Sequence, residues 1–425
     1  MFYRHALCFV LKNTQFLLNN PKKDGSLLCK HPARRILYQI IYMNLAVKTF
    51  VAASALTLFS FSTPSVNNHT TPPEQRKIQV AILLDVSGSM QGLIEQAKAQ
   101  LWNMVSTLGR VRCSDKVTPQ VELALYEYGR TTNEVSKGYV KQLSPFTTDL
   151  DAVSKILFSL RTNGGEEYCG QVIYSSLDEL GWSTEPDMYK VIFIAGNEDF
   201  LQGNLHFTKA CTKAKEKGVI VNTIYCGSYD MAVKEHWILG GECGEGSFTH
   251  INHNYNNFDD IPTPFDATLV QLNTKLNATY VGYGTLGSAN VVRQQEVDML
   301  NSSQGKKTAM KRTEAKAKAN VYSNSSWDMV DAFKADSTFI VKMDKSQLPD
   351  SLRNKSVAEV QQFIKVKTEE RSLIQKQILD ASANRSKYIF EQKTATPGSN
   401  PEKTLETEIE NIIRTQVKRF NMTVE

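Results

Sequence analysis

The sequence lacks any long block of like charge. Lys and Arg number 49 against 44 Asp and Glu in 425 residues, which leaves a formal net charge of +5. A basic tract or face is the usual sign of nucleic-acid binding, so no nucleic-acid partner is expected. With 41% hydrophobic residues the chain can bury a core, and its length indicates two or three domains.

The compact motifs of common metal and catalytic sites are also missing. The sequence has no C-x-x-C pair, no H-E-x-x-H and no G-x-S-x-G, which disfavours a zinc ribbon, a zinc protease and a serine hydrolase. Among His206, His236, His250 and His253, the last two flank a predicted strand end without a partnered carboxylate in an evident helix, and solvent-exposed or ordinary structural roles are expected for all four. We predict no catalytic residue, no organic cofactor and no enzyme activity. A hydrolytic or redox enzyme is the less favoured alternative.

The hydrophobic run near the N-terminus is short for a transmembrane helix. Residues 43–62 combine Lys48, an apolar stretch and small residues at Ser60 and Ser62, the three parts of a secretory signal peptide. We expect cleavage near Ser62, with a retained signal anchor as the alternative. The mature chain is then exported to the periplasm, cell envelope or medium and keeps no integral membrane span.

The segments on either side of this signal have no fold pattern of their own. Residues 1–42 are predicted to be a non-native or unstructured extension, with the natural start at Met43. Residues 63–75 are predicted to be a linker.

Five cysteines remain after the expected cleavage: Cys113, Cys169, Cys211, Cys226 and Cys243. In an oxidising compartment some can pair, and the odd number leaves at least one without a partner in the chain. Cys226 with Cys243 is the first pairing to expect. Buried thiols in the core are an equally good interpretation.

Strand-like and helix-like patterns alternate from about residue 77 to 277. Strands are predicted at 78–84, 120–129, 138–146, 190–196, 219–227 and 246–251. Helices are predicted at 90–109, 149–160 with Thr148 as N-cap, 170–180, 206–218, 231–239 and 264–277, the last one closing the sheet. Repeated strand–helix units with apolar strands specify an α/β fold with a doubly wound, mostly parallel sheet.

One polar motif, "DVSGS", follows the first predicted strand. In an open parallel sheet, ligands bind beyond the carboxyl ends of the strands, and Asp85 lies where the first strand ends. Asp85, Ser87 and Ser89 can converge there. Carboxylate and hydroxyl oxygens are hard ligands that suit Mg²⁺ or Mn²⁺. The other interpretation is that these side chains only cap the following helix.

The motif and its strand–turn–helix setting resemble the metal-ion-dependent adhesion site, Asp-x-Ser-x-Ser, of von Willebrand factor type A (VWA) domains. The resemblance covers 76–278 and implies a Rossmann-like fold. The family usually has a Thr after a Gly-Gly pair, and this sequence has Glu166 at that position, with Glu167 beside it. The family also often has Thr-Asp-Gly at the end of a later core strand, and here Asn197 stands in place of the Asp.

The resemblance implies a metal site of Asp85, Ser87, Ser89, Glu166 and Asn197 that binds a protein or peptide ligand, completed by an acidic residue of the partner. Glu198 and Asp199 lie near enough in sequence to compensate for the charge lost at Asn197. The alternative is a structural or assembly scaffold with a degenerate, metal-free site.

Residues 279–425 have a different composition and are predicted to be mainly helical. Residues 301–326 fit a solvated helix or a connector, and 337–343 fit a short strand. A long helix at 356–391 and a last helix beginning near 400 have apolar stripes, the first broken at Lys367 and Arg371. The two suggest a hairpin that packs on itself, on the α/β domain or on another subunit.

Overall fold

The computed structural model describes residues 76–251, 261–395 and 404–425. The expected N-terminal extension, signal peptide and linker lie outside these residues, as do His253 and the Asn400–Pro401 step predicted to start the last helix. None of the helices within the described ranges is long and apolar enough to cross a membrane.

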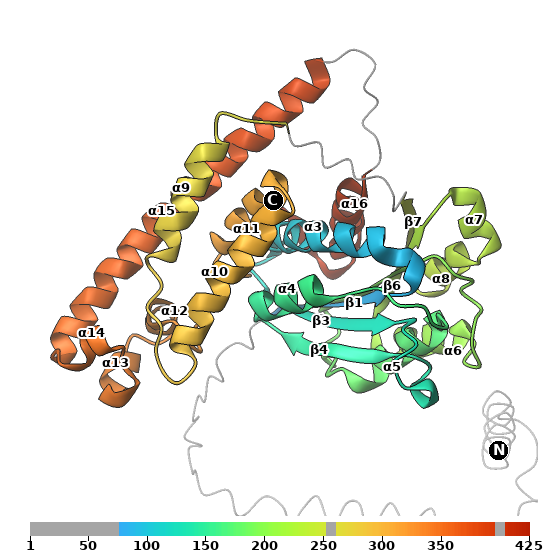
Figure 1. Cartoon of the computed structure of the whole chain (residues 1–425), viewed down its shortest axis with the longest axis horizontal. Helices are drawn as coiled ribbons and strands as arrows, with labels where there is room; N and C mark the ends of the chain where they lie inside the picture. The colour runs from blue at the N-terminus through green and yellow to red at the C-terminus, as the bar shows by residue number, and fades with distance from the viewer. Residues whose placement is uncertain (1–75, 252–260, 396–403) are drawn as a thin grey trace, which may run out of the picture. The chain divides into compact units, whose positions relative to one another are not determined.

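A six-stranded sheet forms the centre of the fold, with strand order β4-β3-β1-β5-β6-β7 (Figure 1). Neighbouring strands are parallel except for β3 and β4, which are antiparallel. The strands are β1 (Lys77–Asp85), β3 (Gln120–Tyr128), β4 (Lys141–Thr147), β5 (Tyr189–Gly196), β6 (Ile220–Cys226) and β7 (Glu245–Ile251). Every residue of β5 is buried, as in a strand covered on both faces. The predicted doubly wound, mostly parallel sheet is confirmed.

Helices cover both faces of this sheet. On one face lie α3 (Gln91–Leu108), α4 (Leu150–Ser159) and α16 (Leu405–Gln416). On the other lie α5 (Cys169–Glu179), α6 (Phe207–Lys217), α7 (Tyr229–Lys234) and α8 (Trp237–Cys243).

Two local predictions in this region are wrong. Asp149, and not Thr148, is the N-cap of α4, because its Oδ1 accepts a hydrogen bond from Ala152 N at 3.0 Å. The single helix predicted at 231–239 is two short helices, because His236 has a left-handed backbone conformation with φ 61° between α7 and α8.

A larger correction concerns the helix that closes the sheet. The sequence predicts that helix at 264–277, but α9 (Asp266–Asn277) packs mainly against α15 and α11. The position beside α3 and β7 is taken by α16 instead. The chain end also forms β8 (Met422–Val424), which pairs with β2 (Val111–Cys113) in a small antiparallel sheet. The α/β layer is therefore completed by the last residues of the chain.

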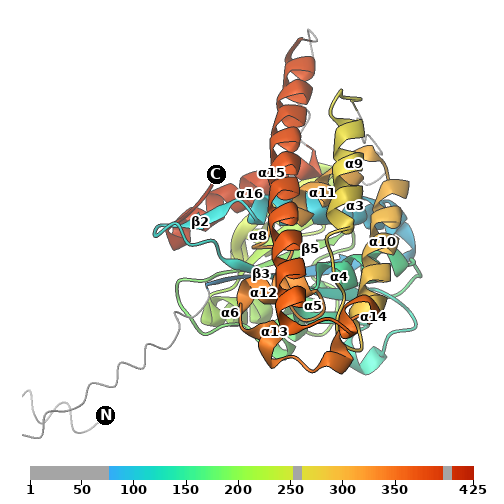
Figure 2. The ribbon, with the colours of Figure 1, turned by 90° about the vertical axis from the view of Figure 1, so that its left-hand side faces the viewer.

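The C-terminal region is helical, as predicted. Its other helices are α10 (Gly287–Ser303), α11 (Lys306–Lys316), α12 (Met329–Ala335), α13 (Phe339–Lys342), α14 (Asp350–Arg353) and α15 (Val357–Ala395). α15 runs beside α9 in both views (Figures 1 and 2). Of the two helices predicted to form a hairpin, α15 packs on α9, α11 and α12, whereas α16 packs on α3 and β7. The two helices therefore contact different partners.

Buried ion pairs explain why this region was difficult to interpret from sequence. Arg312 and Lys316 lie in the stretch expected to be solvated, yet both are buried and pair with Asp298. Arg371, at the break in the apolar stripe, is buried and pairs with Asp328 at 2.6 Å. The short strand predicted at 337–343 is wrong, since those residues include the helical turn α13.

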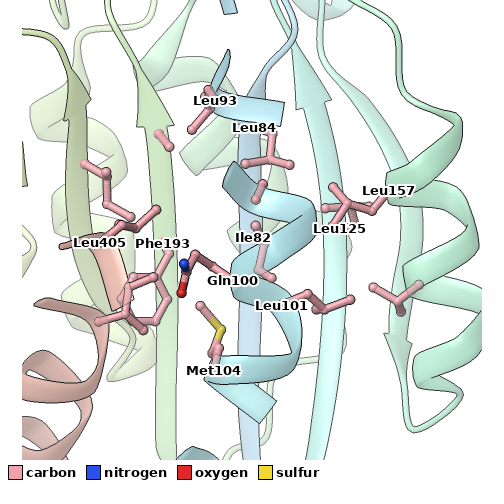
Figure 3. A pocket seen from close by; sticks show the side chains of 15 residues that line it. Ile82, Leu84, Leu93, Gln100, Leu101, Met104, Leu125, Leu157, Phe193 and Leu405 are labelled. Carbon is pink, nitrogen blue, oxygen red and sulfur yellow. The ribbon is translucent and has the colours of Figure 1, made fainter. Parts of the chain in front are cut away.

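A small cavity of about 40 Å³ lies between the sheet, α3 and α16 (Figure 3). Its walls are apolar side chains such as Phe193 and Met104, with the Gln100 amide among them. Leu405 and Ile409 bring α16 into the wall. The volume is far below the roughly 300 Å³ of ordinary ligand pockets. We regard it as a packing gap under α16.

Candidate functional site

Three loops at the carboxyl edge of the sheet are held close together. The first follows β1 and carries "DVSGS". The second is fastened to it, because Asn163 N donates to Val86 O at 2.9 Å, and it is also fastened to the loop after β3, because Thr131 N donates to Gly164 O at 2.8 Å. The third follows β5, which is the direct neighbour of β1 in the sheet. The topology thus places the predicted site residues at one edge.

Asp85 is the most unusual side chain of this edge. It is fully buried, and its Oδ1 accepts a hydrogen bond from Ser87 N at 2.7 Å. Its Oδ2 is buried and has no hydrogen-bond partner in the described part of the chain. Burial is the main cause that raises the pKa of Asp85 to about 7, and the charge of Glu198 contributes. A buried, unpartnered carboxylate oxygen is costly unless something binds it.

The structure also brings Ser87, Ser89 and Asn197 together. Ser87 Oγ and Ser89 Oγ are 3.4 Å apart, and Ser89 Oγ donates to Asn197 Oδ1 at 3.4 Å. These contacts are long for hydroxyl hydrogen bonds, so the oxygens are only weakly engaged with one another. Four of the five residues predicted from the sequence therefore form one cluster of oxygen atoms.

The acidic residue of the second loop that faces Asp85 is Glu167, whereas Glu166 is exposed. A Cβ atom placed on Gly129 would lie 2.9 Å from Asp85 Oδ1 and 3.0 Å from Glu167 Cγ, so the two acidic side chains flank the same glycine. Burial raises the pKa of Glu167 to about 8, followed by repulsion from Asp85, Glu198 and Glu166. The sequence signal was the Glu166–Glu167 pair, but only the loop conformation decides which member faces inward.

Two glycines make room for this arrangement. Gly129 has φ 80°, a left-handed conformation that favours glycine. A Cβ atom on Gly196 would lie 2.5 Å from the Tyr128 hydroxyl and 3.1 Å from Asp85 Oδ2. The space around the Asp85 carboxylate therefore depends on the absence of side chains at both positions, and sequence reasoning had not assigned either glycine to the site.

The other candidate ligands make local contacts of their own. Asp199 Oδ1 accepts from Leu201 N and lies 2.9 Å from His236 Nδ1. His206 caps α6, and His250 of β7 contacts Tyr229 of α7 and Phe248 of β7. Within the described residues, no group of three or more His, Cys, Asp and Glu side chains is arranged to hold a metal ion. Any cation at the Asp85 edge would therefore need hydroxyl and amide oxygens as well.

The predicted disulfide is wrong in one partner. Cys243 of α8 bonds to Cys211 of α6, with Cα atoms 5.7 Å apart. Cys226 is buried at the end of β6 and packs in the core on the face covered by α3, whereas Cys211 and Cys243 belong to the opposite face. Proximity in sequence could not reveal which face of the sheet each cysteine occupies.

Fold and site together define an α/β protein with a cluster of side-chain oxygen atoms at the carboxyl edge of a mostly parallel sheet. No protein-family model and no curated protein matches the chain. Solved structures of VWA domains are among its structural neighbours.

Three neighbours show the extent of this likeness. An aerotolerance-related membrane protein from Bacteroides fragilis with multiple mutations to serines is 15% identical, with a TM-score of 0.30 over 42% of this chain and 93% of that one. The SpRpn10 VWA domain is 14% identical, with a TM-score of 0.31 over 41% and 88%. Proximal thread matrix protein 1 from the mussel byssus, with a zinc-occupied MIDAS motif, is 15% identical, with a TM-score of 0.30 over 43% of each chain. Such low values carry no inference about function.

Proposed function

We propose that this chain is an exported, non-enzymatic binding protein that uses a divalent cation, Mg²⁺ or Mn²⁺, to bind a protein or peptide ligand. The observation that carries the proposal is the fully buried Asp85 with an unpartnered Oδ2. Asp85, Ser87, Ser89, Glu167 and Asn197 would hold the cation, with Glu166 at the rim.

The donor set fits such a cation. Carboxylate, hydroxyl and amide oxygens are hard ligands, and Mg²⁺ usually keeps part of its shell for water or a ligand. When bound, the cation would supply an open coordination position for an acidic side chain of the partner. The protein groups provide the rest: Asp85 and Glu167 supply negative charge, and the two serines and Asn197 supply neutral oxygens.

Export is supported by the Cys211–Cys243 disulfide. Disulfides form and persist in oxidising compartments and are rare in the cytosol. The sequence pattern of a signal peptide at 43–62 indicates the same route.

The second candidate function is a structural scaffold that binds no cation. It is favoured by the hydrogen bond from Ser87 N to Asp85 Oδ1, which is what a simple turn before a helix would also make. Cation binding separates the two functions directly.

Calorimetric titration of Mn²⁺ tests the proposal through the two adjacent glutamates. Glu167→Gln is expected to weaken Mn²⁺ binding at least about tenfold, because a buried carboxylate beside Asp85 is lost. Glu166→Gln is the matched control and is expected to change the affinity less than about threefold, since this side chain is exposed. The opposite order would assign the ligand to Glu166, and no binding by the wild type would support the scaffold.

A further inference from the structure

The first half of the second site loop, residues 160–168, is held by backbone hydrogen bonds and by Arg130. The guanidinium of Arg130 donates to Arg161 O at 2.5 Å and pairs with Glu127 at the end of β3. The backbone hydrogen bonds to the loops after β1 and β3 lie in the same half. These contacts stop before the last three residues of the loop, which include both of its glutamates.

The second half of the loop is held by the ring of Tyr168. A Cβ atom on Gly203, in the third loop, would lie 2.7 Å from Cγ and 2.9 Å from Cδ1 of this ring. A Cβ atom on Gly138, in the loop between β3 and β4, would lie 3.2 Å from Cδ2 of the same ring. Tyr139 meets the ring edge-on, with centroids 5.8 Å apart. One ring thus joins the second loop to two others.

Gly203 suits this contact in two ways. Its φ of 89° is a left-handed conformation that favours glycine, and its lack of a side chain leaves the space that the Tyr168 ring fills. Two residues after Tyr168, Gly170 lies equally close to the third loop, since a Cβ atom there would be 2.4 Å from Leu205 O. The end of the second loop is therefore packed tightly against the third.

The placement of Tyr168 bears directly on Glu167, the residue before it. α5 begins directly after these two residues. Val172 N donates to Tyr168 O at 3.0 Å, which ties the Tyr168 backbone to the first turn of α5. While the ring lies against the neighbouring loops, the Glu167 side chain is buried beside Asp85 and the Glu166 side chain is exposed. A loop that lost this ring contact would be free to present either glutamate.

We infer that Tyr168 is a positioning residue of the candidate site, held in place by Gly138 and Gly203. It fixes the end of the second loop so that Glu167 faces inward and Glu166 faces solvent. The inference rests on the proposed function, in which Glu167 helps to hold the cation. Tyr168 acts on the site only through the backbone of its own loop and through the third loop that it contacts.

Two glycine variants of the full chain test the contact with the ring. Gly203→Ala places a Cβ atom against Tyr168. Gly284→Ala is the matched control, because Gly284 has a left-handed φ of 68° but a Cβ atom there would meet nothing within 4 Å beyond its immediate neighbours. Both variants carry the backbone strain of a left-handed alanine, and only Gly203→Ala also displaces the ring.

Thermal unfolding of the cation-free protein measures this contact in a double-mutant cycle. Gly203→Ala is expected to lower the melting temperature roughly half as much in a Tyr168→Ala background as in the wild type, because the ring that it displaces is already gone. Gly284→Ala is expected to lower it equally in both backgrounds. Equal losses for Gly203→Ala in the two backgrounds would overturn the role of the ring.

Hydrogen exchange in the cation-free protein reports on the end of the loop. Exchange of the Val172 amide, which is bonded to Tyr168 O, is expected to become about tenfold faster in Tyr168→Ala and in Gly203→Ala. It should stay within about twofold of the wild type in Gly284→Ala and in Tyr168→Phe, which keeps the ring. Unchanged exchange in Tyr168→Ala would contradict the positioning role.

Mn²⁺ calorimetry connects this role to the proposed function. Tyr168→Ala and Gly203→Ala are each expected to raise Kd about tenfold, whereas Tyr168→Phe and Gly284→Ala should change it less than about twofold. Equal affinity in Tyr168→Ala and Tyr168→Phe would overturn the inference. If the wild type binds no Mn²⁺, the proposed function fails, while the melting and exchange results still decide whether Tyr168 positions the second loop.

Discussion

Asp85→Asn is expected to stabilise the cation-free protein at pH 8 while it abolishes cation binding. Burial raises the pKa of Asp85 from 3.8 to about 7. Between these values the folded state binds a proton that the unfolded state does not, so stability falls as the pH rises from about 4 to about 7 and levels off above about pH 7. Asn keeps the shape and removes the buried charge. The expected gain is about 4 kcal/mol at pH 8, about 2 kcal/mol at pH 5, where the unfolded Asp85 is already ionised, and near zero only below about pH 4.

Urea unfolding with chelator at both pH values measures this effect. Saturating Mg²⁺ is expected to stabilise the wild type at pH 8 and to leave Asp85→Asn unchanged, because binding to the folded state alone raises stability. Glu166→Gln is the control for removing an exposed negative charge from the same edge. Loss of stability in Asp85→Asn at both pH values would contradict the account, since it would show that the carboxylate is satisfied without a cation.

A chain that ends at residue 278 is expected not to fold stably, although it contains the whole sheet. It lacks residues 405–424, which form α16, the helical turn after it and β8 and bury six large apolar side chains against the rest of the fold: Leu405, Ile409, Ile412, Ile413, Val417 and Met422. Burial of each contributes roughly 1.5 to 3 kcal/mol, and the sum is comparable to the roughly 5 to 15 kcal/mol of a typical folded domain. Circular dichroism and exposure of apolar surface to a fluorescent dye would measure the loss.

Point variants on α16 test the contribution of this helix to stability in the intact chain. Ile413 is fully buried, so Ile413→Ala is expected to cost roughly 2 to 5 kcal/mol in urea unfolding. Asn411 is exposed on the same helix, and Asn411→Ala is expected to change stability by less than about 0.5 kcal/mol. A stable, cooperative 76–278 fragment together with a mild Ile413→Ala would show instead that α16 is only attached to a self-sufficient domain.

The local sequence pattern was enough to predict the strands of the sheet and the first helices that cover it. The apolar strand from Ile78 and the amphipathic helix after Met90 could be predicted because their periodicity is a property of neighbouring residues. The packing partner of that helix could not be predicted in this way, because α3 packs against α16, about 300 residues later in the chain. The helix at 264–277 has a similar apolar pattern, and only the three-dimensional packing shows that α9 faces α15 and α11.

The site was predictable to the extent that a short motif defines it. Asp85, Ser87 and Ser89 are two residues apart at a strand end, so their convergence follows from geometry. The choice between Glu166 and Glu167 depends on the path of the Gly164–Gly165 loop, and either residue satisfies the sequence pattern. The hydrogen bond from Trp237 Nε1 to Glu198 O joins the start of α8 to the loop after β5, and no local signal indicates such a contact.

The most direct test of the cation site is a crystal structure of the intact protein grown with Mn²⁺, with anomalous diffraction used to locate the metal. The account predicts an anomalous peak bonded to the Asp85 carboxylate and within reach of Ser87, Ser89 and Glu167. The peak should be lost in Asp85→Ala crystals grown in the same way. An empty Asp85 edge, or Mn²⁺ bound only elsewhere, would contradict the account and leave "DVSGS" as a turn that begins a helix.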